Sequence, residues 1–325
     1  MSFSSFIENL LPPPRLKKDL YLGFKDNIDG YKNLFLNKEW DILEIKIDKC
    51  TDMDKIFLMH SMMRDKKTTL SLINEWRIVR PKSLYVHIMS ANYFIEIAWE
   101  HRGSYTAENV DKDAWLPFYQ NLDKSYASIQ EAIRINPDEK SIYSILATLG
   151  MANPELISIY EVIDRLSSLD NHYYYAQKRI SYALSSRWQG GENEALDYVY
   201  NICNQVEESS MIHGLIPNVH IERWVDADNL ENYFEQDYVR RDLLTSYEKC
   251  FPKKQFTSDS ISINVLNDFA CCFYIAEFKE QAREILLFLS GRSDKIPWLY
   301  LYNTWFYYED DNYKYTKVHK DLGII

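Results

Sequence analysis

The chain has 325 residues, of which 46% are hydrophobic and 26% charged, so it can bury a large core as a globular protein. Its formal net charge of −11 disfavours direct binding to nucleic acid or to an anionic membrane, because both are negatively charged. No stretch approaches the roughly 18 uninterrupted apolar residues of a transmembrane helix, and the N-terminus lacks the features of a signal peptide. Only 9 glycines and 10 prolines are present, which favours helices with short connections. The cysteines form no CxxC pair and predict reduced thiols in a cytoplasmic protein, at Cys50, Cys203, Cys250, Cys271 and Cys272.

Residues 1–50 are expected to form a helical N-terminal segment, and two interpretations compete for its second part, residues 31–50. Every second residue from Leu43 to Ile47 is apolar, as in a half-buried strand. Trp40, Leu43 and Ile47 also have the spacing of one helical face. The helix is favoured, because an isolated strand would have no sheet to join.

From residue 51 to residue 206 the apolar pattern predicts a TPR-like array of antiparallel helices. One helical stripe ends at Arg80, because the residue before a proline avoids helical geometry. Ser83 can then cap the N-terminus of a long helix, which Gly103 ends. Further stripes follow, separated by breaks at Asn136-Pro137-Asp138, Asn153-Pro154, Asp170-Asn171 and Gly190-Gly191. The 33 residues from Pro137 to Asp170 match the period of a two-helix tetratricopeptide (TPR) repeat, so the predicted fold is all-α, an α-solenoid.

The C-terminal part, residues 207–325, is predicted to be helical, with an acidic face and an aromatic capping helix. Ser210, Gly214 and Pro217 interrupt the apolar pattern, so residues 207–223 are expected to form a connecting loop. A new helix is expected at Asp228, because Glu231 three residues later completes a capping-box pattern. The last helix is expected from Pro297, within an aromatic segment that runs from Trp298 to Tyr308.

No catalytic or metal-binding constellation is recognisable in the sequence. His213 and His220, with Glu222 nearby, have a seven-residue gap that matches no tight metal-ligand spacing, so we expect hydrogen-bonding loop histidines. Gly190 and Gly191 lack the following lysine of a phosphate-binding loop. The carboxylates follow exposed runs, whereas glycosidase chemistry needs two of them in a sheltered cleft. We therefore expect no enzymatic activity, no metal and no cofactor.

Two helix ends share a tryptophan, an arginine and glycine. An arginine beside a helix C-terminus can bond the last carbonyl groups, complement the helix dipole or stack on a neighbouring indole. We expect this structural role rather than ligand binding, and we expect both tryptophans to be largely buried at helix–helix contacts. The residues are Trp99, Arg102 and Gly103 at the first end and Arg187, Trp188, Gly190 and Gly191 at the second.

Carboxylates are concentrated between residues 207 and 237, where Arg223 is the only lysine or arginine. Helix capping alone needs fewer acids than this, so we expect a face that docks a basic protein partner. The alternative is a solvated face with capping acids. The residues concerned are Glu207, Glu208, Glu222, Asp226, Asp228, Glu231, Glu235 and Asp237.

The run Ala98-Trp99-Glu100-His101-Arg102-Gly103 and the later run Arg187-Trp188-Gln189-Gly190-Gly191 resemble an uncharacterised bacterial family of TPR-like proteins. That family has an AWxxRG helix end and a later RW-plus-glycines turn, and the likeness spans residues 70–206. Gln189 departs from the family pattern, in which the glycines directly follow the tryptophan. The resemblance implies an α-helical fold and no established activity. Acidic helical-repeat proteins of this kind are similar to immunity proteins, which neutralise toxins delivered between competing bacteria.

The sequence therefore predicts a cytoplasmic, non-enzymatic protein that binds another protein. The specific expectation is an immunity protein that captures a basic secreted toxin domain, since matching charge raises association rate and selectivity. A TPR-like adaptor that binds a peptide or assembles a protein complex is the alternative. A hydrolase in an α-helical scaffold is the third interpretation.

Overall fold

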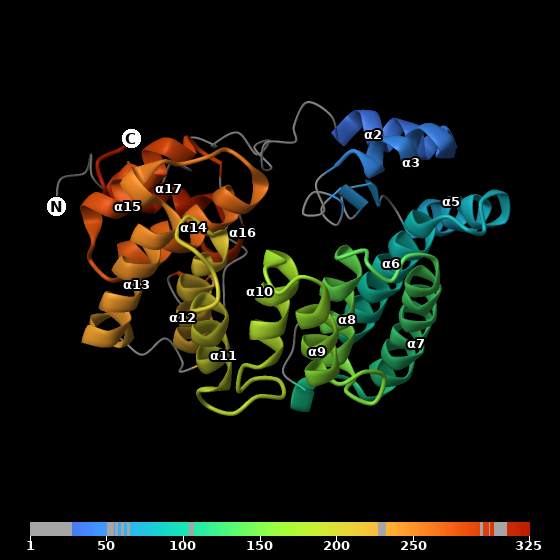
Figure 1. Ribbon diagram of the computed structural model, residues 1–325, viewed down its shortest axis with the longest axis horizontal. Helices are drawn as coiled ribbons and strands as arrows, with labels where there is room; N and C mark the ends of the chain where they lie inside the picture. Colours follow the sequence, from blue (N-terminus) through green and yellow to red (C-terminus); the bar gives the residue numbers. More distant parts are fainter. Residues whose placement is uncertain are drawn as a thin grey trace, which may run out of the picture. The chain divides into compact units, whose positions relative to one another are not determined.

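The structure is a computed structural model, and it is all-α in the part of the chain that it describes (Figure 1). The described residues are 28–50, 55, 58–59, 62–63, 66–103, 107–226, 232–292, 295–298, 300–301 and 311–325. Over these ranges no strand occurs, so the predicted all-α class is confirmed. No helix in the same ranges has the length and apolar character that crossing a membrane requires.

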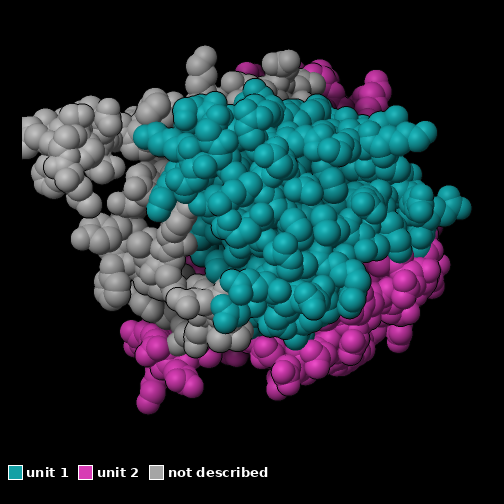
Figure 2. Space-filling view, turned by 90° about the vertical axis from the view of Figure 1, so that its left-hand side faces the viewer, with its two compact units in different colours: residues 1–25, 206–325 teal, residues 26–205 magenta. Residues whose placement is uncertain are grey.

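The chain divides into two compact units, which Figure 2 colours separately. The unit of residues 26–205 contains both tryptophan motifs. Its helices are α2 (Ile28–Leu36), α3 (Trp40–Asp48), α5 (Lys66–Val79), α6 (Leu84–Arg102), η1 (Ala107–Asn109), α7 (Lys112–Ile135), α8 (Ser141–Ala152), α9 (Ile159–Leu169), α10 (Tyr174–Ala183) and α11 (Glu194–Cys203).

Local signals set several boundaries of this unit. Residues 31–50 form α2 and α3, with Trp40, Leu43 and Ile47 buried, so the helical interpretation is confirmed and the strand is wrong. Ser83 caps α6, because its hydroxyl oxygen accepts a hydrogen bond from the Val86 N–H at 3.4 Å. Gly103 ends the same helix with a φ of 71°, a conformation that glycine adopts most easily.

Helix α8 lies at the centre of this unit. It packs against α6, α7, α9 and α10, and these helices run side by side in Figure 1. Ten of its positions are buried, including Ile142, Leu146 and Leu149, so no broad face of this helix meets solvent. A helix that is apolar all round belongs inside a layer of other helices.

The unit that includes residues 206–325 is organised around one buried helix, α14 (Ser260–Ile275). Helix α14 packs against η2, α12, α13, α15 and α16. Cys271 and Cys272 near its C-terminal end are fully buried. The other elements are η2 (Met211–Gly214), α12 (Leu215–Asp226), η3 (Tyr233–Glu235), α13 (Asp237–Cys250), η4 (Pro252–Lys254), α15 (Lys279–Leu289), α16 (Lys295–Trp298) and α17 (Asp311–Asp321).

The connecting loop predicted for residues 207–223 is wrong, because most of this stretch is η2 and α12. Ser210 caps η2 by accepting a hydrogen bond from the Ile212 N–H at 3.3 Å. Pro217 lies in the first turn of α12, where the missing N–H has no intrahelical partner to lose. Gly214 allows close packing, because a Cβ there would meet both methyl carbons of Val265 in α14 at 2.5 Å.

Later boundaries of this unit also differ from the sequence prediction. Asp228 and Glu231 lie outside the described residues, and α13 begins only at Asp237. Pro297 lies inside the short helix α16 rather than at the start of the last helix, which is α17. Most of the aromatic segment, residues 302–308, lies outside the described residues.

The contact between Gly214 and Val265 predicts a non-additive pair of substitutions. Gly214→Ala should lower the free energy of unfolding by about 1–3 kcal/mol, because the added methyl group overlaps the Val265 side chain. The double variant Gly214→Ala/Val265→Ala should lose less than the sum of the two single losses, because the shortened side chain makes room. Chemical denaturation of all four proteins measures this coupling, and strict additivity would contradict the packing described.

Candidate functional site

The two motif tryptophans, far apart in the sequence, are in direct contact. The rings of Trp99 and Trp188 meet edge to face, with centroids 5.8 Å apart and an interplanar angle of 87°. Both side chains are mostly buried but keep some exposed surface, so their burial is not complete. Trp188 also lies in a turn after α10 rather than within a helix. The pair therefore joins the C-terminal end of α6 to that turn.

Arg102 lies among three indole rings. Its guanidinium carbon is 5.2 Å from the ring centroid of Trp99, 5.8 Å from that of Trp115 in α7 and 5.9 Å from that of Trp188. A cation over indole faces is attracted by the electron-rich rings. Its Nη1 also donates a hydrogen bond of 3.2 Å to the carbonyl oxygen of Gly103. The structural role expected for Arg102 therefore agrees with its contacts.

The second arginine behaves differently from the first. Arg187 lies with its guanidinium carbon 5.8 Å from the ring centroid of Tyr182. Arg187 is exposed. The two motifs share their residue types, with Arg102 against indole rings and Arg187 against the Tyr182 phenol ring.

The turn after Trp188 is built from Gln189, Gly190 and Gly191. The Gln189 side-chain amide donates to the carbonyl oxygens of Gly150 and Met151, the latter at 3.1 Å, and so satisfies the C-terminal end of α8. A Cβ on Gly190 would lie 2.9 Å from the Cα of Leu184 and would overlap the Leu184 carbonyl group. The Gly191 N–H donates to the carboxylate of Glu194 at 2.9 Å.

These contacts predict that the two glycines differ in importance. Gly190→Ala should lower the free energy of unfolding by about 1–3 kcal/mol or more, because the backbone must move away from Leu184. Gly191→Ala is the matched control, because the atom nearest to its Cβ would be Glu194 Oε2 at 3.9 Å. Thermal or chemical melts compare the two variants. Equal losses would contradict the steric role of Gly190.

The acidic residues predicted to form one docking face are placed at two ends of α13. Glu207 and Glu208 lie near its C-terminal end, because the Ser209 N–H donates to the Lys249 carbonyl oxygen at 2.6 Å. Glu235 and Asp237 lie at its N-terminal end. The 14 residues of α13 separate the two pairs by about 20 Å along the helix axis. All four side chains are exposed.

The other predicted acidic residues do not join these pairs. Glu222 is only 7% exposed within α12, so its carboxylate is not part of an exposed face, and this part of the prediction is corrected. Asp226 is half-buried at the last position of α12. Asp228 and Glu231 lie outside the described residues. The exposed part of the predicted face is therefore Glu207 and Glu208 together, and Glu235 and Asp237 together.

His220 is the centre of a buried hydrogen-bonded chain that the sequence did not predict. Its Nδ1 lies 2.8 Å from the Tyr233 hydroxyl oxygen, and its Nε2 lies 3.2 Å from an Asp242 carboxylate oxygen. The carboxylate can only accept, so Nε2 carries the proton and Nδ1 accepts from the Tyr233 O–H. Arg223 donates to the hydroxyl oxygens of Tyr233 and Tyr238. Burial lowers the pKa of His220, so the imidazole is neutral at pH 7.

Neither histidine singled out in the sequence is arranged as a metal ligand. His213 Nε2 lies 3.1 Å from the Glu207 carbonyl oxygen, so both histidines are engaged with protein groups. In the described ranges, no three His, Cys, Asp or Glu side chains are grouped as a metal site requires. Asp242 and Tyr233 are 22 and 13 residues from His220, so no local spacing could have revealed this chain.

The buried histidines predict how stability depends on pH. Burial lowers the pKa values of His213, His220 and His319, so the folded protein binds fewer protons than the unfolded chain as the pH falls through about 6.5. The free energy of unfolding should therefore decrease from pH 6.5 to pH 5. His220→Gln should flatten this slope by up to about 1.4 kcal/mol per pH unit, measured by denaturant titration at each pH. An unchanged slope in the variant would contradict a neutral, buried His220.

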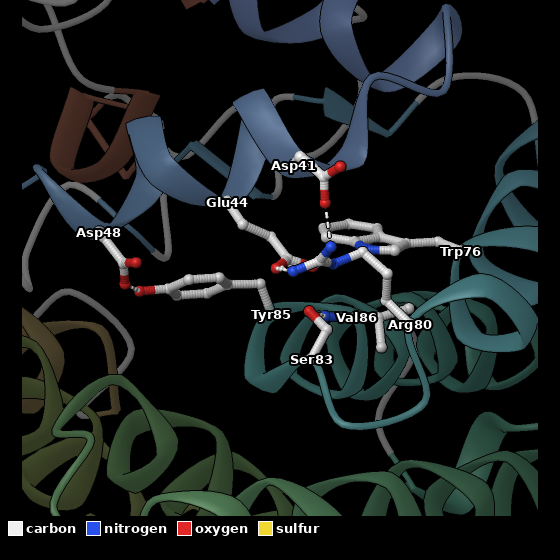
Figure 3. Close-up of polar contacts among 8 residues, drawn as sticks. All are labelled: Asp41, Glu44, Asp48, Trp76, Arg80, Ser83, Tyr85 and Val86. Atoms are coloured by element: carbon white, nitrogen blue, oxygen red, sulfur yellow. Dashed lines mark hydrogen bonds and ion pairs between the residues drawn. The ribbon is translucent and has the colours of Figure 1, made fainter.

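A second polar cluster joins α3 to the end of α5 (Figure 3). The Glu44 carboxylate accepts from the Trp76 indole N–H at 2.8 Å and from Arg80 Nε at 3.0 Å. Arg80 also contacts Asp41, and the Glu44 hydrogen bond raises the Arg80 pKa above its ordinary value. The ring of Trp40 stacks on that of Trp76 at 5.1 Å. These contacts hold α3 against α5, so we assign the cluster a structural role rather than a catalytic one.

The comparisons with known proteins cover part of the chain. Residues 37–155 match the family model described as Domain of unknown function (DUF4034), which is consistent with the resemblance to an uncharacterised family. The match includes Trp99, Arg102 and Trp115, but it ends before Trp188. It gives no link to TPR or immunity proteins. No curated protein and no solved structure matches the chain significantly.

Proposed function

We propose that this protein is a non-enzymatic binding protein of the immunity type, which captures and neutralises a basic toxin domain in the cytoplasm. The observation that carries the proposal is the set of exposed carboxylates at the two ends of α13. Among the described residues, none of the four forms an ion pair, so their charges face solvent and are available to a partner. They are Glu207, Glu208, Glu235 and Asp237.

A basic partner complements this charge. Toxins that act on nucleic acid need positive surfaces to hold their substrate, and an inhibitor with exposed carboxylates is attracted to the same surfaces. The attraction accelerates association and selects against acidic competitors. The overall charge of −11 acts in the same direction. Arg241 is exposed one helical turn after Asp237, so the N-terminal end of α13 is acidic but not uniformly so.

The scaffold in this proposal is a TPR-like α-solenoid. Helix α8 packs against α6 and α10, and α7 and α9 also pack against α8. Such contacts between alternate helices are typical of stacked helix pairs. The starts of α8 and α10, Ser141 and Tyr174, are 33 residues apart, which is within the range of two-helix repeats. These observations support the repeat, and the same layer would suit the alternative, a peptide-binding adaptor.

The buried chain through His220 does not favour the hydrolase alternative. A nucleophilic hydroxyl needs access to substrate and an adjacent base that lowers its pKa. Tyr233 is only 5% exposed, and burial raises its pKa above the ordinary value. We therefore assign the hydrogen bonds of His220 a structural role, in which they hold α12, η3 and α13 together.

The proposal predicts that charge reversal slows partner association. The partner is captured from the native host by affinity purification and identified by mass spectrometry, and association rates are then measured by stopped flow. Glu235→Lys/Asp237→Lys and Glu207→Lys/Glu208→Lys should each lower the association rate about tenfold or more at low salt. The effect should shrink as salt rises, because exposed charges are screened beyond about 8 Å at physiological ionic strength.

The matched control is Glu280→Lys, an exposed carboxylate in α15 outside the acidic segment. Its association rate should stay near that of the unchanged protein. Thermal melts of every variant check that folding is intact, because surface substitutions usually change stability by less than about 0.5 kcal/mol. An acidic partner, or association without salt dependence, would sink the immunity model and favour the adaptor.

A further inference from the structure

An open cleft lies between α9 and α11, in the unit of residues 26–205. Its volume is about 610 Å³, within the range of pockets that hold small ligands or side chains. Two carboxylates, two tyrosines and two aliphatic side chains contribute to its lining. These residues are Tyr160, Ile163, Leu184, Glu194, Asp197 and Tyr198.

Glu194 is held in place at the start of α11. Its Oε1 accepts a hydrogen bond of 2.7 Å from the Tyr160 hydroxyl, and its Oε2 accepts the bond from the Gly191 N–H. The hydrogen bond from Tyr160, with that from Gly191, lowers the Glu194 pKa below its ordinary value. The carboxylate is therefore ionised and fixed before any ligand arrives. Each of its oxygens keeps capacity for a further donor.

Asp197 supplies a second negative charge on the same side of α11. It follows Glu194 by three residues, so the two side chains are neighbours on the helix surface. Asp197 is exposed, and among the described residues its carboxylate has no ion pair or hydrogen bond. Like charges in this position repel each other, and a bound cation removes that repulsion.

The remaining walls suit a long apolar stem with an aromatic contact. Ile163 and Leu184 line the cleft with aliphatic carbon, while Tyr160 is 52% exposed beside Glu194. Tyr198 is oriented by a hydrogen bond from its hydroxyl to the Gln177 side chain. A planar guanidinium can bond carboxylates through its fork of N–H groups and also stack on an aromatic ring. An ammonium group also bonds carboxylates, but as a point charge, and it has no plane that can stack on a ring.

We propose that this cleft binds the arginine side chain of a basic partner protein, with its guanidinium between Glu194 and Asp197 and its aliphatic stem against Ile163 and Leu184. The proposal deepens the proposed function and rests on it only for the source of the arginine. It also gives the second glycine-containing turn a role in binding. Gly190 lets the turn pass close to Leu184, and Gly191 fixes Glu194.

The test titrates the protein with N-acetyl-arginine amide and follows methyl-labelled Ile163 and Leu184 by NMR. Both methyl signals should shift saturably, with a dissociation constant on the order of millimolar, whereas the signal of Leu287 in α15 should not move. N-acetyl-lysine amide should shift them more weakly. N-acetyl-citrulline amide, which has the same shape without the charge, should shift them least. Added salt should weaken the arginine response.

Asp197→Asn should weaken binding of the arginine amide about two- to fivefold, because one exposed carboxylate is lost. Asp123→Asn, an exposed carboxylate of α7, is the matched control and should bind as the unchanged protein does. No saturable shift, or an equal response to the citrulline amide, would overturn the cleft proposal. An equal response to the lysine amide would overturn the choice of a guanidinium.

These outcomes are independent of the charge reversals at α13. If the arginine amide binds at the cleft while the α13 variants associate normally, the cleft stands and the proposed electrostatic docking fails. If the amide does not bind while the α13 variants associate slowly, the cleft proposal fails alone.

Discussion

The guanidinium of Arg102, surrounded by three indole rings, links separate segments of the unit of residues 26–205. Trp99 comes from α6, Trp115 from α7 and Trp188 from the turn after α10, so one cation links two consecutive helices to a turn that is distant in sequence. The charge also lies at the C-terminal end of α6, where a cation complements the helix dipole. A lysine in this place would keep the charge but lose the planar stacking on the indoles.

The same contact positions the turn that follows Trp188. Once Trp188 is fixed against Trp99, Gln189 reaches the end of α8, Gly190 crosses Leu184 and Gly191 reaches Glu194. A structural cluster on one side of the turn is thus continuous with an anionic cleft on the other. The geometry of the cleft therefore depends on how the turn after Trp188 packs, and not on residues with an evident binding role.

The sequence predicted several helix boundaries in the described part of residues 26–205, because their signals are local. Ser83, Gly103 and the spacing of Trp40, Leu43 and Ile47 each act within a few residues. It failed at residues 207–223, where Gly214 and Pro217 suggested a loop. A glycine that permits close packing on Val265 and a proline in a first turn look the same in sequence as loop residues.

The candidate sites were harder to predict, because they depend on contacts between distant residues. Charge density alone placed Glu222 on an exposed face, although α12 buries it. The hydrogen bonds of His220 and the hydrogen bond from Tyr160 to Glu194 join residues in different elements. The spacing of apolar residues in the sequence contains no information on such pairs. The two motifs share residue types, which gave a reason to compare Trp99 with Trp188. The sequence did not indicate the distance between the two rings or the arginine that both contact.

The burial of α14 gives the protein two internal thiols whose chemical labelling reports unfolding. Cys271 and Cys272 are fully buried, and burial raises the pKa values of both thiols well above the ordinary range. Only a thiolate reacts readily with alkylating reagents, so these two cysteines stay unreactive until α14 meets water. Cys50, half-buried beside Tyr31, is more accessible than the other four cysteines. A thiol reagent would therefore label the folded protein first at Cys50, and later modification of the α14 pair would record each opening of the core.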